Sequence, residues 1–491
     1  MKYSSPEKHG IKSEWIKEYI QVLEKSKIAT HNLIIMRDDH ILFEKYWEPF
    51  NKDFLHRMYS VTKSFVSLAI GFLEQDGKIS LDDPIVKYFP EESKDVTDEN
   101  VKNQTIRNML MMSTAKADWG WFWARTNDRV VQYFKNNLTS RPAGTTFSYD
   151  SAGSFVLCAL VERVTGKSFM EYSREKYLDR IGFSKEAYML KCPGGHSWGD
   201  SALICKATDL LKAAMFCMHK GNIDGQQLLN EEYITAATSR QIDTNPAGIS
   251  GFDKHGYGYQ IWRTYDNSYM FYGIGSQFAL CIPDKNIIMV HNGDTQGNPE
   301  ACTIVIEKFF EIIARRAKAT TLDDTGSTEL KQHTERLKLL SVSGNASSPI
   351  MSKINGITYM MDENPMGITK LKLTFEEDCG ILSYTNAQGE KEIIFGMCKN
   401  EFSMFPQEGY SDEVGSMPGN RLYKYGASAT WVNTYQLFIK VQIIDTYFGT
   451  LNITLGFNDD KIGVYMNKWS EDFLDEYNGF AGGKVQNKKN N

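Results

Sequence analysis

The sequence predicts an α/β domain followed by a C-terminal antiparallel β domain. In residues 1–320, strand-like segments occur near both ends and segments with helical spacing lie between them. Beyond residue 350 the period changes, and apolar residues alternate with polar ones. A chain of 491 residues with 42% hydrophobic residues is also long enough for two or three domains.

The first domain begins with a predicted helix over residues 14–23 and a β-hairpin of residues 32–36 and 41–46. Residues 60–76 carry Phe65, Ala69, Phe72 and Leu73 at helical spacing, and Gly77 stands where a C-terminal cap belongs. This helix is apolar around much of its circumference, so we expect it in the domain interior. Further helices are predicted at 105–112, 151–165, 169–177, 207–219 and 303–317, and late strands at 269–272, 278–282 and 287–291.

Strands at both ends of this region indicate that the two ends share one sheet. Residues 321–349 are rich in Thr, Asp, Ser and Gly around a helical segment at 329–340, and they are interpreted as a linker. Residues 350–491 contain alternating runs such as Leu437, Ile439, Val441 and Ile443, separated by polar turns. We expect these residues to form an antiparallel, barrel-like domain.

The composition excludes several classes of function. The net charge is -6, and no block of Lys or Arg supports binding to nucleic acid. The N-terminus lacks the apolar run of a signal peptide, and no apolar stretch is long enough for a membrane span, so a cytoplasmic protein is expected. The eight cysteines form no Cys-x-x-Cys pair and the nine histidines no His-Glu-x-x-His motif, so we predict no metal and no cofactor.

The chemistry is predicted to lie at Ser60. A serine hydroxyl becomes a useful nucleophile when a nearby base takes its proton, and Lys63 lies one helical turn away. The spacing alone is common, since three other Ser-x-x-Lys matches occur, at 5–8, 113–116 and 173–176. Only Ser60 begins a helix predicted to be buried.

A position at the start of that helix favours catalysis. Free N–H groups and the positive end of the helix dipole stabilise developing negative charge, and the N–H of Ser60 is one candidate oxyanion donor. Burial would also disfavour the charged ammonium of Lys63 and so favour its action as a base. The alternative for an isolated match is that Ser60 caps the helix and Lys63 lies at the surface.

Four segments in a fixed order give the match its context. Residues 58–64 (MYSVTKS), 77–85 (GKISLDDPI), 105–114 (TIRNMLMMST) and 141–151 (RPAGTTFSYDS) together resemble β-lactamases, DD-peptidases and related esterases and amidases. The resemblance covers residues 30–310 and implies the α/β fold of that superfamily, an antiparallel sheet flanked by helices. It also implies that Ser60 is a nucleophile that forms an acyl-enzyme.

The resemblance assigns a second catalytic residue, Tyr149. Related enzymes carry Tyr-x-Asn here, and their tyrosine exchanges protons with the nucleophile and the leaving group. Ser151 stands in place of the asparagine, so a hydrogen-bonding side chain is kept but an amide is lost. Asp150 is a weaker candidate, for which a turn or N-cap role is the alternative.

The third family element, Lys-Thr-Gly or His-x-Gly, is matched by residues 273–277 (GIGSQ). Gly275 would let the substrate approach closely, and the N–H of Ser276 would be the second oxyanion donor. The cationic or imidazole side chain that pairs with a penicillin or peptide carboxylate is missing. This segment is therefore more similar to nylon-oligomer hydrolases and esterases of the superfamily.

Two groups outside these motifs are weaker candidates for the walls of the cleft. Trp119, Trp121 and Trp123 alternate between the first two catalytic segments, a pattern that also suits a packed strand or loop. His196 and Trp198 precede a helix in a glycine-rich stretch.

The prediction is a serine hydrolase that acts on a small-molecule or short-peptide amide or ester, with Ser60, Lys63 and Tyr149 as catalytic residues. One alternative is a β-lactamase or D-amino-acid peptidase of low activity, and another is a non-catalytic, penicillin-binding-like module. The C-terminal domain resembles the lipocalin-like domains that follow some members of the superfamily. The sequence makes no prediction of oligomeric state.

Overall fold

The computed structural model describes residues 1–117, 126–136, 138–245, 251–410, 418–469, 471 and 474–486. The chain forms two compact units, of which the first runs from Met1 to Lys338 and the second begins at Leu339. Each unit has its own sheet.

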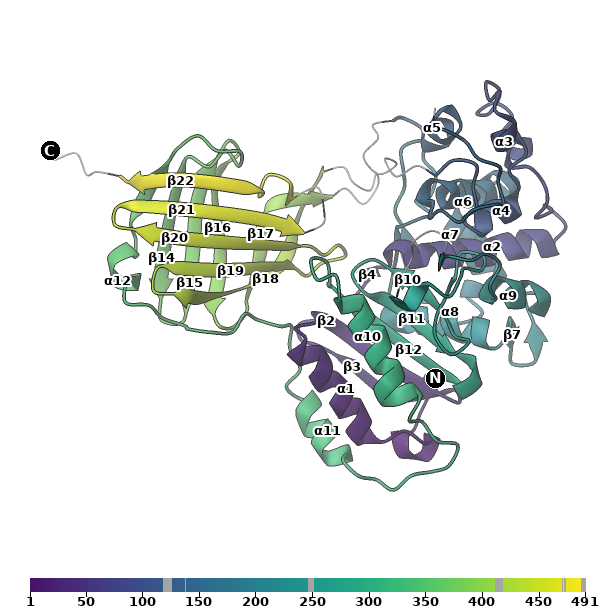
Figure 1. The fold of residues 1–491 in the computed structure, drawn as a ribbon, viewed down its shortest axis with the longest axis horizontal. Helices are drawn as coiled ribbons and strands as arrows, with labels where there is room; N and C mark the ends of the chain where they lie inside the picture. Colours follow the sequence, from purple (N-terminus) through teal and green to yellow (C-terminus); the bar gives the residue numbers. More distant parts are fainter. Residues whose placement is uncertain are drawn as a thin grey trace. The chain divides into compact units, whose positions relative to one another are not determined.

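The first unit contains a seven-stranded sheet in the order β1-β3-β2-β12-β11-β10-β9 (Figure 1). Its strands are β1 (Lys2–Tyr3), β2 (Thr30–Arg37), β3 (His40–Tyr46), β9 (Trp262–Arg263), β10 (Tyr269–Gly273), β11 (Gln277–Ile282) and β12 (Ile287–Gly293). All neighbours are antiparallel except β1 and β3. Because β2 pairs with β12, strands from both ends of the unit share one sheet, as the sequence predicts.

Helices cover both faces of this sheet. Both β2 and β12 are buried along their whole length, and each has a run of four apolar residues, Leu33–Met36 in β2 and Ile287–Val290 in β12. One face packs against α1 (Ser13–Lys25) and α10 (Ala301–Phe309) (Figure 1). Ile20 and Phe309 belong to the core on this face. On the other face, α8 (Ala207–Met218) contacts β11 and β12.

The predicted buried helix forms α2 (Thr62–Gln75), and every residue from Thr62 to Leu73 is buried. Its end follows the predicted signal, because Gly77 has a φ of 66° and its N–H bonds the carbonyl of Glu74. The neighbouring helix α6 (Ser151–Thr165) has the predicted bounds. Further α-helices of this unit are α3 (Glu99–Lys102), α4 (Ile106–Leu110), α5 (Arg129–Lys135), α7 (Phe169–Ser173), α9 (Glu231–Thr238) and α11 (Ser327–Thr334).

Five short strands join these helices into the fold. A small three-stranded sheet contains β4 (His56–Arg57), β5 (Tyr188–Met189) and β6 (Leu203–Cys205) in the order β4-β6-β5. A separate hairpin is formed by β7 (Asn222–Ile223) and β8 (Gln226–Gln227). The small sheet matters for the site, since β4 leads directly into the Ser60 segment.

The second unit is an antiparallel β-barrel, as predicted for the C-terminal domain. After α12 (Met351–Ile354) come β13 (Thr358–Met361), β14 (Lys370–Glu376), β15 (Cys379–Asn386), β16 (Gly389–Met397), β17 (Glu401–Tyr410), β18 (Pro418–Asn433), β19 (Gln436–Ile443), β20 (Thr450–Asn458), β21 (Lys461–Trp469) and β22 (Gly479–Val485). The last strand pairs with the first, β22 with β13, and a short parallel pairing of β16 with β18 completes the closure. Alternate residues such as Leu437, Ile439 and Val441 are fully buried, as their period of two requires.

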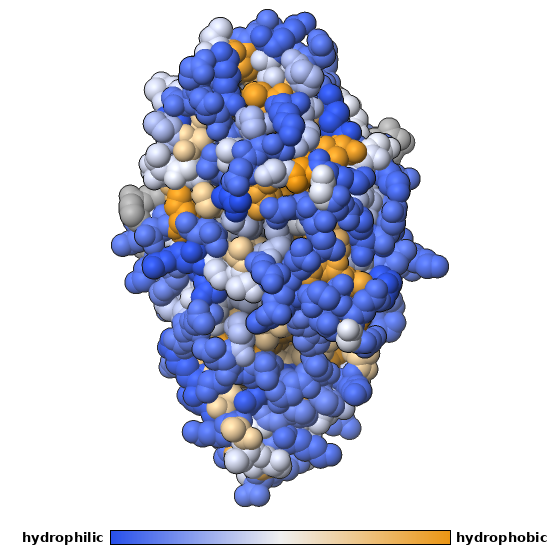
Figure 2. All heavy atoms as spheres, turned by 90° about the vertical axis from the view of Figure 1, so that its right-hand side faces the viewer, coloured by the Kyte–Doolittle hydropathy of each residue, from blue (hydrophilic) through white to orange (hydrophobic). Residues whose placement is uncertain are grey.

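The surface carries no broad apolar area on the face drawn in Figure 2, where hydrophilic residues dominate and hydrophobic ones form small, separate groups. In the described part of the chain, no helix has both the length and the apolar character that a bilayer-spanning segment needs.

Candidate active site

Ser60 lies in a strained turn between β4 and α2. The preceding residue, Tyr59, has a φ of 47°, a left-handed conformation that is unusual for a residue other than glycine. The Arg57 guanidinium lies 4.4 Å from the centre of the Tyr59 ring and holds it in place. Ser60 is partly exposed although Tyr59 and Val61 are buried, so this turn presents the Ser60 hydroxyl at the surface.

Lys63 lies directly behind Ser60. Its Nζ donates a hydrogen bond to Ser60 Oγ at 3.0 Å and another to the carbonyl oxygen of Asp200 at 2.6 Å. Only 1% of Lys63 is exposed, so its amine is held away from water by fixed partners. The three-residue spacing thus places a hydroxyl and an amine in the contact that a nucleophile and its base require.

Tyr149 is brought to the same amine. Lys63 Nζ lies 5.1 Å from the centre of the Tyr149 ring, and that ring stacks on Trp262 with 5.6 Å between centroids. Tyr149 is partly exposed and lies just before α6. Ser60, Lys63 and Tyr149 therefore form one cluster although Tyr149 follows Ser60 by 89 positions in the sequence.

The residues after Tyr149 hold the start of α6. Asp150 is the N-cap, and its side chain accepts a hydrogen bond from the N–H of Gly153 at 3.1 Å. Ser151 is buried in the first turn, and no hydrogen bond joins it to Ser60 or Lys63 among the described residues. The capping alternative is thus observed for Asp150, while a substrate role for Ser151 stays a prediction.

The end of β10 abuts the Ser60 turn at Gly273. A Cβ atom at this position would clash with the carbonyl oxygen of Met58 and come within 3.3 Å of the Ser60 amide nitrogen. Glycine at position 273 therefore permits a close approach of the two backbones. The role of Gly275 in admitting the substrate stays a prediction. The next residue, Ile274, is 52% exposed beside this contact. In the sequence, the only indication of this contact is a glycine in a strand-like segment.

Ser276 lies on the buried side of the same hairpin. It has no exposed surface, its Oγ lies 2.7 Å from Thr295 Oγ1, and its carbonyl oxygen lies 2.9 Å from His291 Nδ1. Gln277 Nε2 donates a hydrogen bond to the carbonyl oxygen of Gly275 at 3.0 Å, and this buried contact fixes the turn. This burial does not favour an oxyanion role for the Ser276 N–H, because a substrate oxygen must reach its donor.

His196 and Trp198 serve the packing of a neighbouring loop. His196 Nδ1 lies 2.8 Å from Glu162 Oε2 on α6, and the Trp198 ring lies 4.8 Å from the Arg57 guanidinium. This loop continues to Asp200, which contacts Lys63 and which no motif in the sequence indicated. The segment with Trp119, Trp121 and Trp123 lies outside the described residues.

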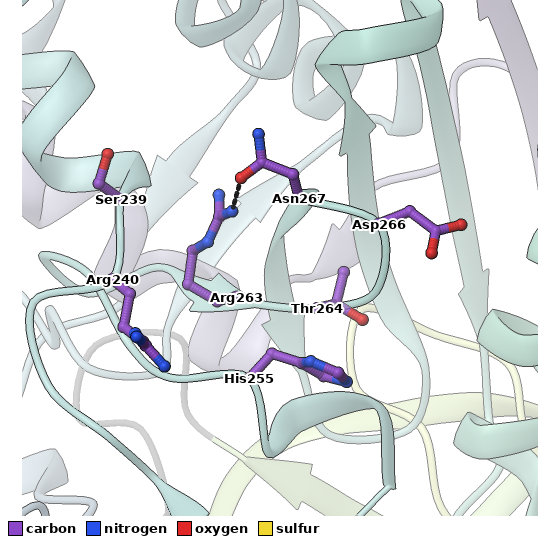
Figure 3. Close-up of a pocket in the computed structure, with 7 residues that line it drawn as sticks. All are labelled: Ser239, Arg240, His255, Arg263, Thr264, Asp266 and Asn267. Carbon is purple, nitrogen blue, oxygen red and sulfur yellow. Dashed lines mark hydrogen bonds between the residues drawn. The ribbon is translucent and has the colours of Figure 1, made fainter.

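A separate hollow of about 400 Å³ lies on the first unit and is lined by Ser239, Arg240, His255, Arg263, Thr264, Asp266 and Asn267 (Figure 3). Its charged groups already have partners within the protein. Arg263 donates to Asn267, as Figure 3 shows, and Arg240 pairs with Asp243. Since none of the predicted catalytic residues lines it, we do not assign it to the reaction. Within the described ranges, no three His, Cys, Asp or Glu side chains are arranged to hold a metal ion.

A family model named Beta-lactamase matches residues 15–302, which is more than half of the chain. The chain belongs to the beta-lactamase family. The matched range contains the Ser60–Lys63–Tyr149 cluster and ends within α10.

Proteins similar to this chain include hydrolases of different names. The 6-aminohexanoate-dimer hydrolase of Paenarthrobacter ureafaciens is 25% identical over 264 residues, which cover 50% of this chain and 67% of that protein. A solved structure of a 6-aminohexanoate-dimer hydrolase candidate from Bacillus anthracis has a TM-score of 0.51 at 17% identity and covers 60% of this chain and 80% of its own. The structure of EstCE1, a hydrolase with promiscuous acyltransferase activity, has a TM-score of 0.50 at 13% identity. The match covers 61% of this chain and 99% of the EstCE1 chain. At these identities the two structures support the fold alone.

Proposed function

We propose that this beta-lactamase family member is a serine hydrolase that cleaves an amide or ester bond through a Ser60 acyl-enzyme. The observation that carries the proposal is the 3.0 Å contact between Lys63 Nζ and Ser60 Oγ at the start of a buried helix. A primary amine in such contact with a partly exposed hydroxyl is the arrangement of an activated nucleophile.

In the proposed acylation, Ser60 Oγ attacks the carbonyl carbon and its proton passes to Lys63 Nζ. The carbonyl oxygen takes the negative charge, and the tetrahedral intermediate then collapses as the bond to the leaving group breaks. Tyr149 gives its phenolic proton to the leaving nitrogen or oxygen and recovers one from Lys63. Water then attacks the ester carbonyl, passes a proton back along the same groups and releases the acid and Ser60.

We propose the N–H groups of Ser60 and Ile274 as the oxyanion donors, in place of the predicted pair of Ser60 and Ser276. The support is the close approach of Gly273 to the Ser60 amide and the exposure of Ile274 beside it. Two such donors aimed at the developing charge are a large contribution to acyl transfer.

The substrate is proposed to be a small amide or ester, or a short peptide, without a carboxylate next to the scissile bond. The Gly273-to-Gln277 turn contains no cation to pair with such a group. Tyr149 stacks on Trp262, whose ring centre lies 6.3 Å from that of Tyr272, and this aromatic group suits an uncharged acyl chain. The name of the Paenarthrobacter relative, a dimer hydrolase, is consistent with an amide substrate.

The deciding experiment is intact-mass detection of a covalent adduct with a fluorophosphonate or p-nitrophenyl acetate on wild type and Ser60→Ala. We expect one adduct on wild type and none on Ser60→Ala. Labelling that survives in Ser60→Ala would refute Ser60 as the nucleophile. No labelling of folded wild type would favour the non-catalytic binding module, and rapid turnover of a chromogenic cephalosporin would favour the β-lactamase alternative.

A further inference from the structure

The loop before β6 is fixed on both sides of Asp200. On one side, Ser197 Oγ donates a hydrogen bond to Glu162 Oε1 at 2.7 Å, which ties the loop to α6. On the other side, Arg57 Nε donates to the carbonyl oxygen of Ser201 at 2.9 Å, which ties it to β4. Asp200 is therefore held in one position relative to α2 and the Ser60 turn.

Asp200 meets the catalytic lysine from inside the domain. Its carbonyl oxygen accepts the 2.6 Å hydrogen bond from Lys63 Nζ, and the residue has no exposed surface. Neither of its carboxylate oxygens has a hydrogen-bond partner within the part of the chain that the structure describes. A buried carboxyl group without such partners is costly, so the fold retains it against a free-energy penalty.

Cations from three elements compensate for this burial. Burial raises the pKa of Asp200 above its ordinary value, while Lys63 on α2, Arg129 on α5 and Arg57 on β4 act in the opposite direction. The thiols of Cys158 and Cys192 also face the carboxyl group, and burial raises the pKa of both. Lys63 is the largest of the charge contributions that favour the carboxylate form.

In many enzymes a third group contacts the base of a nucleophile–base pair and orients it. The base gains positive charge when it takes the nucleophile's proton, and a fixed partner that orients it and opposes that charge lowers the barrier. Here Ser60 Oγ, Lys63 Nζ and the Asp200 carbonyl follow one another at 3.0 and 2.6 Å.

We propose that Asp200 is a positioning residue that completes a Ser60–Lys63–Asp200 relay. Its carbonyl orients the Lys63 amine, and its buried carboxylate stabilises the Lys63 ammonium formed when the Ser60 proton arrives. Asp200 itself neither gains nor loses a proton, so the step that it assists is the transfer from Ser60 Oγ to Lys63 Nζ. The inference rests on the proposed function, since it assigns a role within the same acylation step.

The test is the pH profile of second-order labelling by a fluorophosphonate, measured on the full chain for wild type and Asp200→Asn. The amide keeps the size of the side chain and the backbone carbonyl but removes the charge. We expect the rate plateau to fall about ten- to a hundredfold, as for loss of general-base assistance. We expect the acidic limb to move about one pH unit lower, because the ammonium loses a neighbouring anion.

Asp209→Asn is the matched control. Asp209 is another fully buried aspartate of the same unit, but it caps α8 and accepts from the Ser184 N–H at 2.8 Å. This variant should lower the melting temperature and leave the acidic limb where it is in wild type. If Asp200→Asn does not fold, Asp200→Ser takes its place and carries the same expectations.

The outcomes separate the two proposals. A folded Asp200 variant whose acidic limb coincides with that of wild type would overturn the role of Asp200 while leaving Ser60 as nucleophile. An acidic limb that moves equally in Asp209→Asn would also overturn it, because the effect would be structural. Wild type that forms no adduct at Ser60 would remove the proposed function, and the relay with it.

Discussion

Gly273 on β10 lies so close to Ser60 that a methyl group at Gly273 would come within 3.3 Å of the Ser60 amide nitrogen. The same methyl group would clash with Met58, so Gly273→Ala must push the strand away from the turn. We expect kcat/KM to fall about a hundredfold, the size of effect seen when one oxyanion donor is displaced. Steady-state kinetics on a chromogenic ester would measure the loss of kcat/KM, and thermal unfolding would show whether the variant is folded. The control is Gly463→Ala on β21, where nothing lies within 4 Å of the added carbon; equal losses of activity in both variants would contradict the prediction.

Ile274→Pro tests the second oxyanion donor, because proline has no N–H. We expect the acylation rate to fall about 10²- to 10³-fold, with little change in Ile274→Val, which keeps the N–H. Stopped-flow measurement of the acylation burst would give both rates. If Ile274→Pro is acylated as fast as Ile274→Val, the Ile274 N–H is not an oxyanion donor.

Tyr149→Phe separates leaving-group protonation from packing, because the ring that stacks on Trp262 and faces Lys63 is kept. Amide hydrolysis should fall about 10²- to 10⁴-fold, since an amine leaves only after it is protonated. A p-nitrophenyl ester should be affected much less, because p-nitrophenolate leaves without a proton. Tyr257→Phe, which removes a buried hydroxyl beside the same tryptophan, should keep the wild-type ratio of amide to ester rates. Equal losses on amide and ester in Tyr149→Phe would argue against the proton-donor role.

Three buried histidines predict that the first unit loses stability in mild acid. Burial lowers the pKa of His56 to about 3 and that of His291 to about 4, and burial with the neighbouring His56 and His291 holds the pKa of His31 well below its usual range. Unfolded histidine titrates near pH 6.5, so below that pH the unfolded chain binds protons that the folded chain excludes. The contribution of the neutral histidines is complete above about pH 6.5 and is lost as the pH falls toward 4 and 3.

The free energy of unfolding should therefore drop by about 2 kcal/mol for each of these histidines between pH 7 and pH 5. Urea unfolding at the two pH values would measure the difference. His56→Phe, in the aromatic surroundings of Phe50 and Phe54, should show a smaller drop than wild type. An unchanged drop in His56→Phe would contradict the assignment.

Several elements follow from local pattern alone. The bounds of α6 and the burial of α2 agree with their helical spacing, and the alternation at Leu437, Ile439 and Val441 is that of the barrel strands. The order of motifs was also enough to indicate the family, because related chains keep chemistry-bearing segments in sequence. These features depend on contacts between residues close in the chain, or on periodicity that one sheet face imposes.

The contacts that define the candidate site depend instead on where distant segments meet. From the sequence we could predict the two kinds of domain, the Ser60 and Lys63 spacing and the position of Tyr149 before a helix. The packing of the whole fold was needed to show that Gly273 abuts Ser60, that Ser276 is buried, and that Asp200 reaches Lys63. The physical reason is that packing and hydrogen bonds between distant segments determine which side of a hairpin is buried and where a loop is held. A single sequence shows neither.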